Sequence, residues 1–335
     1  MGNTVMEIIA ITGLAVVAGM ILDLLLGDPA FLPHPVVLMG NAVSRLEKKL
    51  RGVFPKTEKG ELAAGRIMAW AMVLSVFTLT SLISVVSYAV SPVLFFWIQT
   101  VWCWQTVAIK DLAKEAKGVY RYLAEEPDLE KARKQVSRIV GRDTQDLSEE
   151  GVTKAVIETV AENFSDGVAA PVFYMMIGGG PLAMTYKCIN TMDSMVGYKN
   201  EKYLYFGRAG AHMDDAAGFL PSRIAALLWI AAAFFTGRDY KNAWRIWRRD
   251  RFNHASPNSA QTESACAGAL DVQLLGPAYY FGEYYDKPTV GDPIRPVRTD
   301  DILSSVLLLY AASMLAYAVG TAIRFAVIFP WLTTL

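Results

Sequence analysis

Charged residues are scarce in this 335-residue sequence: Asp, Glu, Lys and Arg make up 19% of it, against about 25% in ordinary soluble domains. Hydrophobic residues make up 53%. The 32 basic and 32 acidic residues cancel, which argues against a nucleic-acid-binding protein, because such proteins carry a clustered positive excess. The wealth of aliphatic and aromatic side chains excludes disorder. The composition therefore predicts a membrane protein.

Cysteine and histidine are also rare, with three of each. Cys103, Cys188 and Cys266 lie far apart, so the sequence predicts neither a disulfide framework nor a thiolate metal site, and each is expected to be a small buried hydrophobe. The sequence contains no H-E-x-x-H zinc motif, no phosphate-binding G-x-x-x-x-G-K-[ST] loop, no dinucleotide-binding G-x-G-x-x-G after a strand and no G-x-S-x-G elbow. Any nucleotide must therefore bind through something other than a common soluble fold.

Long uncharged runs predict the fold. A membrane-spanning helix needs about 18 or more apolar residues, and four runs meet or nearly meet that length: 8–22, which lies within the wider run 5–26 and is flanked by Glu7 and Asp23, then 67–90, 93–109 and 302–323. Two runs are ambiguous: 168–186 contains the break Gly178-Gly179-Gly180-Pro181, and 224–236 is short. We expect an all-α, polytopic integral membrane protein with four firm transmembrane helices and two segments that are re-entrant or spanning, in a single membrane-embedded domain over residues 1–335.

Basic residues indicate the orientation. Segments 27–61, 110–167 and 237–300 carry most of the Lys and Arg, so the positive-inside tendency places them in the cytoplasm. We expect a cytoplasmic helical insertion over 110–167. Residues 237–300 should form a cytoplasmic loop region with a basic interfacial helix at 240–251, where Trp244 and Trp247 alternate with cations, although a plain solvated helix face is the alternative. The expected location is the inner (cytoplasmic) cell membrane, with several passes.

One stripe of polar residues has a metal-site spacing. Lys154, Glu158, Glu162 and Asp166 recur every four residues, so a helix would place them on one face. Carboxylates one turn apart suit Mg²⁺ when phosphate oxygens and water complete its shell. The alternative is a solvated face on which Lys154 pairs with Glu158.

Other polar groups border the apolar runs. Ionisable groups there are costly unless paired, so they are functional candidates, with structural pairing as the alternative. Two proline-containing loops also hold a histidine that could move a proton, although a capped loop would explain either. Tyrosines around residues 279–285 would suit a planar ligand or lipid headgroups. The candidates outside the stripe are Asp28, His34, Asn163, Ser165, Lys187, Asn190, Asp193, Lys199, Asp215, Arg223, His254, Ser256, Asn258 and Ser259.

Four motifs, in order, resemble a known family. They are D-L-L-L-G-D-P at 23–29 with His34-Pro35, E-T-V-A-E-N at 158–163 with S-D-G at 165–167, N-T-M-D-S-M-V-G-Y at 190–198, and S-P-N-S at 256–259. Together they resemble the CbiB/CobD family, the membrane-bound adenosylcobinamide-phosphate synthases of cobalamin biosynthesis, over nearly the whole chain. Residues 260–263 read A-Q-T-E where the family usually has Gly, a variable residue, Pro and Glu. The local geometry of that loop is therefore expected to differ, with Glu263 in place.

The resemblance implies an ATP-dependent ligase that joins the free propionate of adenosylcobyric acid to 1-amino-2-propanol phosphate, or a related amino alcohol, through an acyl phosphate. Mg²⁺ would be held by Glu158, Glu162, Asp166 and Asp193. Phosphates and substrates would be bound by Lys187, Asn190, Lys199, Arg223, Ser256, Asn258, Ser259, Asn163, Ser165, Asp28 and His34. His254, Asp215 or Glu162 would handle protons during amine attack.

The resemblance also implies the partners: the two small-molecule substrates and membrane lipid, with no nucleic acid. A homo-oligomer and association with other corrinoid-pathway enzymes both stay open. Because ATP is cytoplasmic, the active site should face the cytoplasm, which favours a re-entrant 168–186 over a six-span bundle. A membrane transporter and a non-catalytic corrinoid-binding membrane module are the alternative functions.

Overall fold

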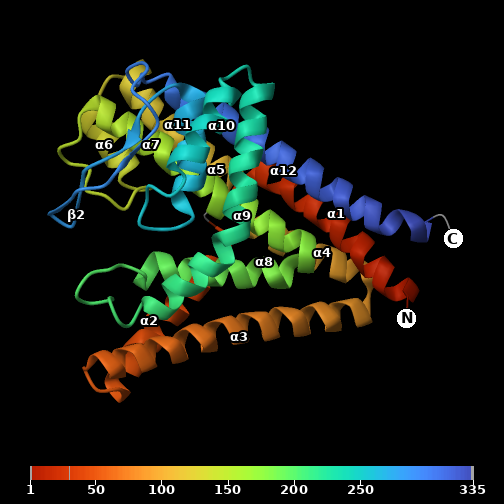
Figure 1. Ribbon diagram of the computed structural model, residues 1–335. Coiled ribbons are helices and arrows are strands. Elements are labelled where there is room, and N and C mark those ends of the chain that lie inside the picture. The colour runs from red at the N-terminus through yellow and green to blue at the C-terminus, as the bar shows by residue number, and fades with distance from the viewer. Residues whose placement is uncertain (1, 30, 333–335) are drawn as a thin grey trace. The chain divides into compact units, whose positions relative to one another are not determined.

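The computed structural model describes residues 2–29 and 31–332, and most of these form helices (Figure 1). The predicted all-α, polytopic membrane fold is confirmed. By their contacts the helices group into two compact units. Unit 1 comprises residues 1–108, 170–218 and 317–335, and unit 2 comprises residues 109–169 and 219–316. Helices α9 (Arg208–Phe235) and α12 (Asp301–Leu332) contribute to both.

Unit 1 is built from long apolar helices: α1 (Gly2–Leu26), α2 (Pro35–Val53), α3 (Glu58–Val90), α4 (Pro92–Gln105) and α8 (Ala170–Val196). Helices α3 and α4 form an antiparallel hairpin that turns at Ser91-Pro92, where the Ser91 hydroxyl accepts a hydrogen bond from the Val93 N–H. Helix α8 packs against α1, α2, α3 and α4. The centre of this unit is therefore α8.

Unit 2 contains shorter, polar helices and small strand pairs: α5 (Ile109–Tyr120), the π-helix η1 (Arg121–Glu125), α6 (Leu129–Val136), α7 (Glu149–Phe164), the π-helix η2 (Ser165–Ala169), α10 (Tyr240–Asp250), α11 (Ser259–Leu270), β1 (Leu274–Leu275), β2 (Ala278–Tyr280), β3 (Glu283–Tyr285) and β4 (Thr289–Val290). Asp128 and Ser148 cap α6 and α7 as the sequence predicts. Two of the three segments predicted to be cytoplasmic, 110–167 and 237–300, fall in this unit, and the third, 27–61, falls in unit 1. Helix α7 packs on α5, α6 and α11.

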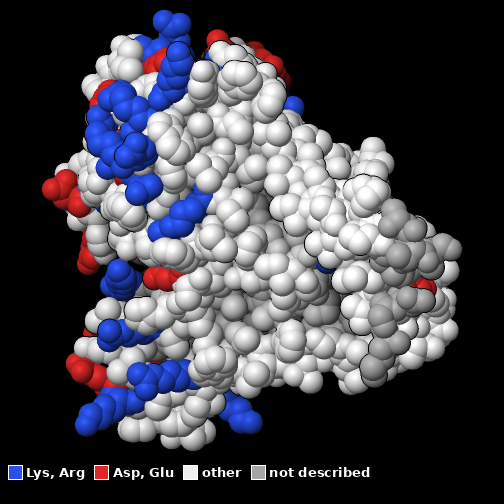
Figure 2. All heavy atoms as spheres, turned by 45° about the vertical axis from the view of Figure 1, so that its right-hand side comes forward, with Lys and Arg blue, Asp and Glu red and all other residues white. Residues whose placement is uncertain are grey.

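Six helical stretches in the described part of the chain have the length and apolar composition to cross a membrane: Thr4–Leu26, Glu58–Val90, Pro92–Glu125, Glu149–Val196, Arg208–Phe235 and Asp301–Pro330. Both ambiguous segments thus belong to long helices, which favours the six-span alternative and a multi-pass membrane protein. In α3 only 17% of the most apolar window is buried, so its apolar side chains face outward, toward lipid. Figure 2 shows this helix with cations at one end and an uncharged remainder.

The break predicted in residues 168–186 is present in α8. Gly178 and Gly179 leave helical geometry, and Gly179 has φ 63° and ψ −152°, a conformation that suits glycine. Arg324 on α12 donates from Nε to the Met176 carbonyl at 3.0 Å and from Nη2 to the Met175 carbonyl at 3.2 Å. Gln99 accepts from the Gly180 N–H at 2.7 Å. Side chains from two other helices therefore satisfy the backbone groups that the break exposes.

Candidate active site

Glu158 lies at the centre of the polar side chains of unit 2. It sits on α7 and is 2% exposed. One carboxylate oxygen, Oε2, pairs with the Arg142 guanidinium, and the other, Oε1, accepts the Leu275 N–H at 2.7 Å. Lys154 pairs with Glu150 at 2.7 Å, so the sequence alternative that joined it to Glu158 is wrong. Glu158 thus connects α7 to two loops distant in sequence.

Two more glutamates join α7 to α11. Glu162 Oε1 accepts a hydrogen bond of 2.8 Å from the Ser259 hydroxyl. Glu263, 2% exposed, has a buried Oε2 without a hydrogen-bond partner in the described chain. Burial, and then the charges of Glu162 and Glu158, raise the pKa of Glu263 well above its ordinary value. Glu263 is therefore a buried carboxyl group that tends to keep its proton.

His254 lies in the loop between α10 and α11. Its Nδ1 accepts the Ser256 N–H at 3.0 Å, and the Ser256 hydroxyl accepts the Asn258 N–H at 3.2 Å. Burial lowers the pKa of His254, although the Glu162 charge opposes this. Because Nδ1 accepts, this hydrogen-bond network assigns the proton of the neutral ring to Nε2. In this form His254 donates a hydrogen bond through Nε2.

Arg223 on α9 is held by uncharged groups. Its Nη1 donates to the Asn258 Oδ1 at 2.9 Å and to the Ser222 hydroxyl at 3.0 Å, and its Nη2 donates to the Pro257 carbonyl at 3.2 Å. Arg251 lies close enough to exert a repulsive charge on Arg223. Neither arginine has a carboxylate partner within the described ranges. Two adjacent guanidinium groups without counter-charges suit an anionic ligand.

The four carboxylates expected to hold Mg²⁺ do not fit a metal site as arranged. Both oxygens of Glu158 already have partners, and Asp166 lies in η2, beyond the helix that carries Glu158 and Glu162. Asp193 belongs to unit 1. Within the described residues, no three His, Cys, Asp or Glu side chains form a group that could hold a metal ion. We therefore derive no reaction step through a protein-bound metal.

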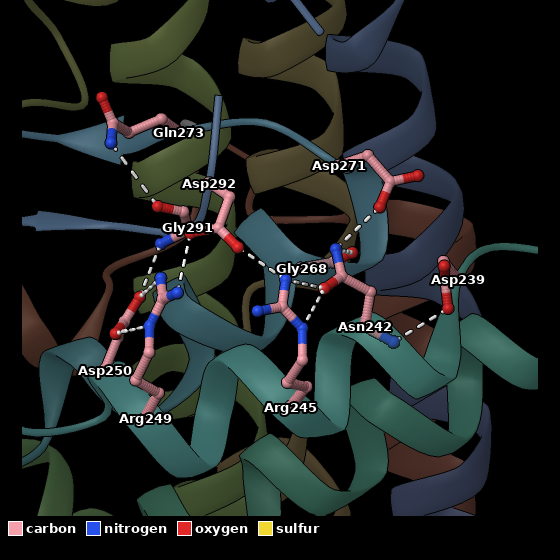
Figure 3. A network of polar contacts seen from close by, with 10 residues as sticks. All are labelled: Asp239, Asn242, Arg245, Arg249, Asp250, Gly268, Asp271, Gln273, Gly291 and Asp292. Atoms are coloured by element: carbon pink, nitrogen blue, oxygen red, sulfur yellow. Dashed lines mark hydrogen bonds and ion pairs between the residues drawn. The ribbon is translucent and has the colours of Figure 1, made fainter. Parts of the chain in front are cut away.

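Hydrogen bonds and ion pairs join the basic helix α10 to the segment that directly follows β4 (Figure 3). Arg245 and Arg249 both bond to Asp292, at 2.6 and 2.7 Å, and the buried Asp250 accepts the Gly291 N–H at 2.8 Å. These two arginines, predicted to lie at an interface, thus have partners inside unit 2. Tyr240, Lys241, Trp244 and Arg248 are exposed on the same helix, as are the side chains of Arg245 and Arg249.

The remaining unit 2 candidates lie where α7 ends. Asn163 donates to the Thr159 carbonyl on its own helix at 3.1 Å. Ser165 and Asp166 lie in η2, and the buried Ser165 hydroxyl has no partner among the described groups. π-Helical turns of this kind are frequent at functional sites.

The other predicted residues belong to unit 1. Asp28, His34 and Lys187 line one cavity of about 540 Å³, in which the His34 Nε2 lies 3.6 Å from an Asp28 oxygen. Asn190 contacts Asp214, the neighbour of the predicted Asp215, at 3.4 Å. Asp193 lies on α8, Asp215 on α9, and the exposed Lys199 in the loop between these helices.

Four residues of the unit 2 site were missed as candidates: Arg142, Arg251, Glu263 and Lys287. Arg142 lies in the sequence Gly141-Arg142-Asp143-Thr144, which is typical of a break between helices. Glu263 appeared in the sequence analysis only as the last residue of the segment that departs from the family pattern. Lys287 follows the tyrosine-rich segment and acts electrostatically on both His254 and Glu263. A signal for Arg142 was available, because a buried glutamate next to a membrane segment requires a cation.

Comparison with known proteins identifies the family. The family model described as CobD/Cbib protein matches residues 16–309. "Cobalamin biosynthesis protein CobD" of Clostridium perfringens is 42% identical over 92% of this chain and 97% of its own length. The protein of the same name from Geobacter metallireducens is 45% identical over 90% and 94%, and "Cobalamin biosynthesis protein CbiB" of Salmonella choleraesuis is 42% identical over 91% and 95%. No solved structure matches the chain significantly. The chain therefore belongs to the CobD/CbiB family of cobalamin biosynthesis proteins.

Proposed function

We propose that the chain is an ATP-dependent amide ligase that joins the free propionate of adenosylcobyric acid to 1-amino-2-propanol phosphate, or a related amino alcohol, to give adenosylcobinamide phosphate. ATP enters as its Mg²⁺ complex. The observation that carries this proposal is the pairing, in one compact unit, of two guanidinium groups without a carboxylate partner among the described residues (Arg223, bound by neutral oxygens, and Arg251, over the Trp247 ring) with the buried Glu158 and Glu263. The first suits phosphate, and the second suits proton handling.

The reaction balances in two steps. The propionate oxygen attacks the γ-phosphorus of ATP, which gives an acyl phosphate and ADP. The amine then attacks the acyl carbon, phosphate leaves, and the nitrogen loses a proton as the amide forms. Phosphoryl transfer gains mostly from positioning and from neutralising charge, the task assigned to Arg223 and Arg251.

Each acidic or basic residue has one role in this scheme. Glu162, which accepts the Ser259 hydroxyl through Oε1, is the proposed acceptor for the amine proton. His254 donates from Nε2 to a phosphate or carbonyl oxygen, because its Nδ1 is engaged by the Ser256 N–H. Asn258 and Ser222 fix the direction of Arg223.

The location follows from the substrates. ATP is cytoplasmic, so we place the active site on the cytoplasmic side of the inner membrane, with unit 2 carrying the basic segments that the positive-inside tendency keeps there.

The test uses the purified full-length chain in detergent with ATP, Mg²⁺, adenosylcobyric acid and aminopropanol phosphate. We expect equal amounts of ADP and adenosylcobinamide phosphate, measured by chromatography. Arg223→Gln should lower kcat/KM by roughly tenfold or more, since a charged hydrogen bond to phosphate is lost. Arg238→Gln on the loop before α10 is the matched control. Absence of both products with the wild-type chain would refute the ligase.

A further inference from the structure

The β2–β3 hairpin presents two chemically different faces. Its register pairs Ala278 with Tyr285 and Tyr279 with Tyr284. Because side chains alternate along a strand, Tyr280, Glu283 and Tyr285 share one face, where the Tyr285 hydroxyl donates to Glu283 Oε2 at 3.2 Å, while Tyr279 and Tyr284 share the other. The Tyr280 and Tyr285 ring centroids lie 5.6 Å apart, and those of Tyr279 and Tyr284 lie 5.5 Å apart.

The face with Tyr280 carries a cation. Lys287 donates to the Tyr280 hydroxyl at 2.6 Å, and its ammonium lies 4.1 Å from the centre of that ring. No carboxylate pairs with Lys287 in the described chain. A half-buried ammonium whose partner is a neutral phenol is available to an anionic ligand. Lys287 also acts electrostatically on His254 and Glu263 of the candidate active site.

The same hairpin is fixed to Glu158 from two sides. At its tip, Phe281 and Gly282 both have positive φ, 54° and 80°, as a two-residue hairpin turn requires, and both amides donate to the Asp143 carboxylate. Arg142, the residue before Asp143, pairs with Glu158. At its base, the Leu275 N–H donates to the other oxygen of Glu158. The position of the hairpin is thereby set by the active-site glutamate.

We infer that the Tyr280–Tyr285 face of the hairpin holds the carboxylate-bearing corrinoid, with Lys287 on the reacting propionate and the tyrosine rings against the macrocycle. This inference rests on the proposed function and names the substrate element within it. Chemical complementarity favours the corrinoid as the ligand, because the Lys287 ammonium binds an anion and the tyrosine rings pack against a flat apolar surface. The ATP phosphates are the other source of an anion, and the experiment separates the two.

The test compares two variants that alter the proposed binding face of the hairpin with two control variants that leave this face unchanged. Lys287→Gln and Tyr285→Ala change the proposed binding face, whereas Lys241→Gln on α10 and Tyr284→Ala on the opposite face are the matched controls. Equilibrium dialysis of the full chain measures binding of adenosylcobyric acid and of its uncharged carboxamide. Steady-state kinetics then give KM for the corrinoid and for ATP.

We expect Lys287→Gln to weaken binding of the acid by roughly ten- to a hundredfold, the size of a charged hydrogen bond, and to leave binding of the carboxamide unchanged. Tyr285→Ala should weaken both corrinoids equally. The KM for ATP should stay the same in all four variants. Rescue of the acid preference by Lys287→Arg would support the charge assignment.

Three results would overturn the inference. A raised KM for ATP in Lys287→Gln would assign the lysine to phosphate. Equal losses at Tyr284 and Tyr285 that disappear in lipid nanodiscs would assign the hairpin to lipid headgroups. Unchanged corrinoid binding in both binding-face variants, with a fully active wild-type chain, would refute the proposed role of the hairpin. The proposed ligase function would not be affected by that result. A wild-type chain that neither binds the corrinoid nor forms product would instead refute the proposed function.

Discussion

Buried polar groups have different roles in the two units. In unit 1, Arg324 and Gln99 bond to the backbone of a broken helix, donating to freed carbonyls and accepting from the Gly180 N–H. In unit 2, Glu158 pairs with the Arg142 side chain and accepts the Leu275 N–H, and one oxygen of the buried Glu263 has no partner among the described groups. The first arrangement completes the hydrogen bonding of the backbone and therefore fixes shape. The second concentrates charge beyond what the fold needs, which is a mark of a functional site.

We expect the largest loss of stability from a substitution that breaks the ion pair between Arg142 and Glu158 in unit 2. Arg142→Met would leave Glu158 buried without its cation, and we expect a loss of about 3–5 kcal/mol in the free energy of unfolding. Thermal unfolding in detergent, followed by circular dichroism, measures it. Arg138→Met is the control, since Arg138 is 63% exposed in its pair with Glu115 and should cost less than about 1 kcal/mol. Equal losses in the two variants would remove the distinction between buried and exposed pairs.

The next effect tests the unit 1 arrangement. Gly179→Ala forces a side chain onto φ 63° and brings its Cβ within 2.7 Å of the Thr12 methyl group and 2.8 Å of the Gln99 amide oxygen. We expect a loss of about 1–3 kcal/mol, the usual cost of such backbone strain. Gly167→Ala, whose Cβ would meet nothing within 4 Å, should change stability little. A neutral result at Gly179 would mean that the break is not fixed by these contacts.

The pH dependence of stability should sharpen the contrast at Glu263. Since its folded pKa is raised above the ordinary 4.5, the unfolded chain loses this proton first as pH rises. Stability is therefore greatest below pH 4.5 and falls above it, toward the folded pKa. Glu263→Gln should flatten this slope and melt higher than wild type at pH 8. A wild-type melting temperature that rises between pH 5 and 8 relative to the variant would contradict the sign.

The smallest effect concerns the α10 network. Hydrogen bonds from Arg245 and then Arg249 lower the pKa of Asp292, so its stabilisation is present above the ordinary value of 3.8 and is lost as pH falls through the folded pKa. The Asp292 side chain is 32% exposed, which limits the effect to less than about 1 kcal/mol. Asp292→Asn should reduce stability at pH 7 and leave it unchanged at pH 2.5. A difference that persists at the lower pH would point to packing rather than charge.

The sequence predicted much of the fold because its signals are local. The α3–α4 hairpin follows from one Ser-Pro step between uncharged runs, and the caps Asp128 and Ser148 mark the starts of α6 and α7. The break in α8 follows from three glycines and a proline. Each signal lies within a few residues of the structure it specifies.

Parts of the site were less predictable, because partner choice depends on distant segments. A spacing of four placed Glu158 beside Lys154, yet its partners are Arg142, 16 residues away, and the Leu275 N–H, 117 residues away. The same spacing suggested a four-carboxylate metal site, which the π-helical turn at Asp166 and the two partners of Glu158 disfavour. Arg223, Asn258 and Ser259 were candidates from the sequence, but their contacts required the folded chain.

The sequence by itself determined the membrane character, the helix ends and the family, since hydropathy, capping and ordered motifs are read along the chain. Tertiary structure decided which charges meet. Burial makes an unpaired carboxylate costly, so Glu158 takes whichever donors the packing of α7 brings near, and helical spacing alone carries no information about loops that arrive from elsewhere in the chain.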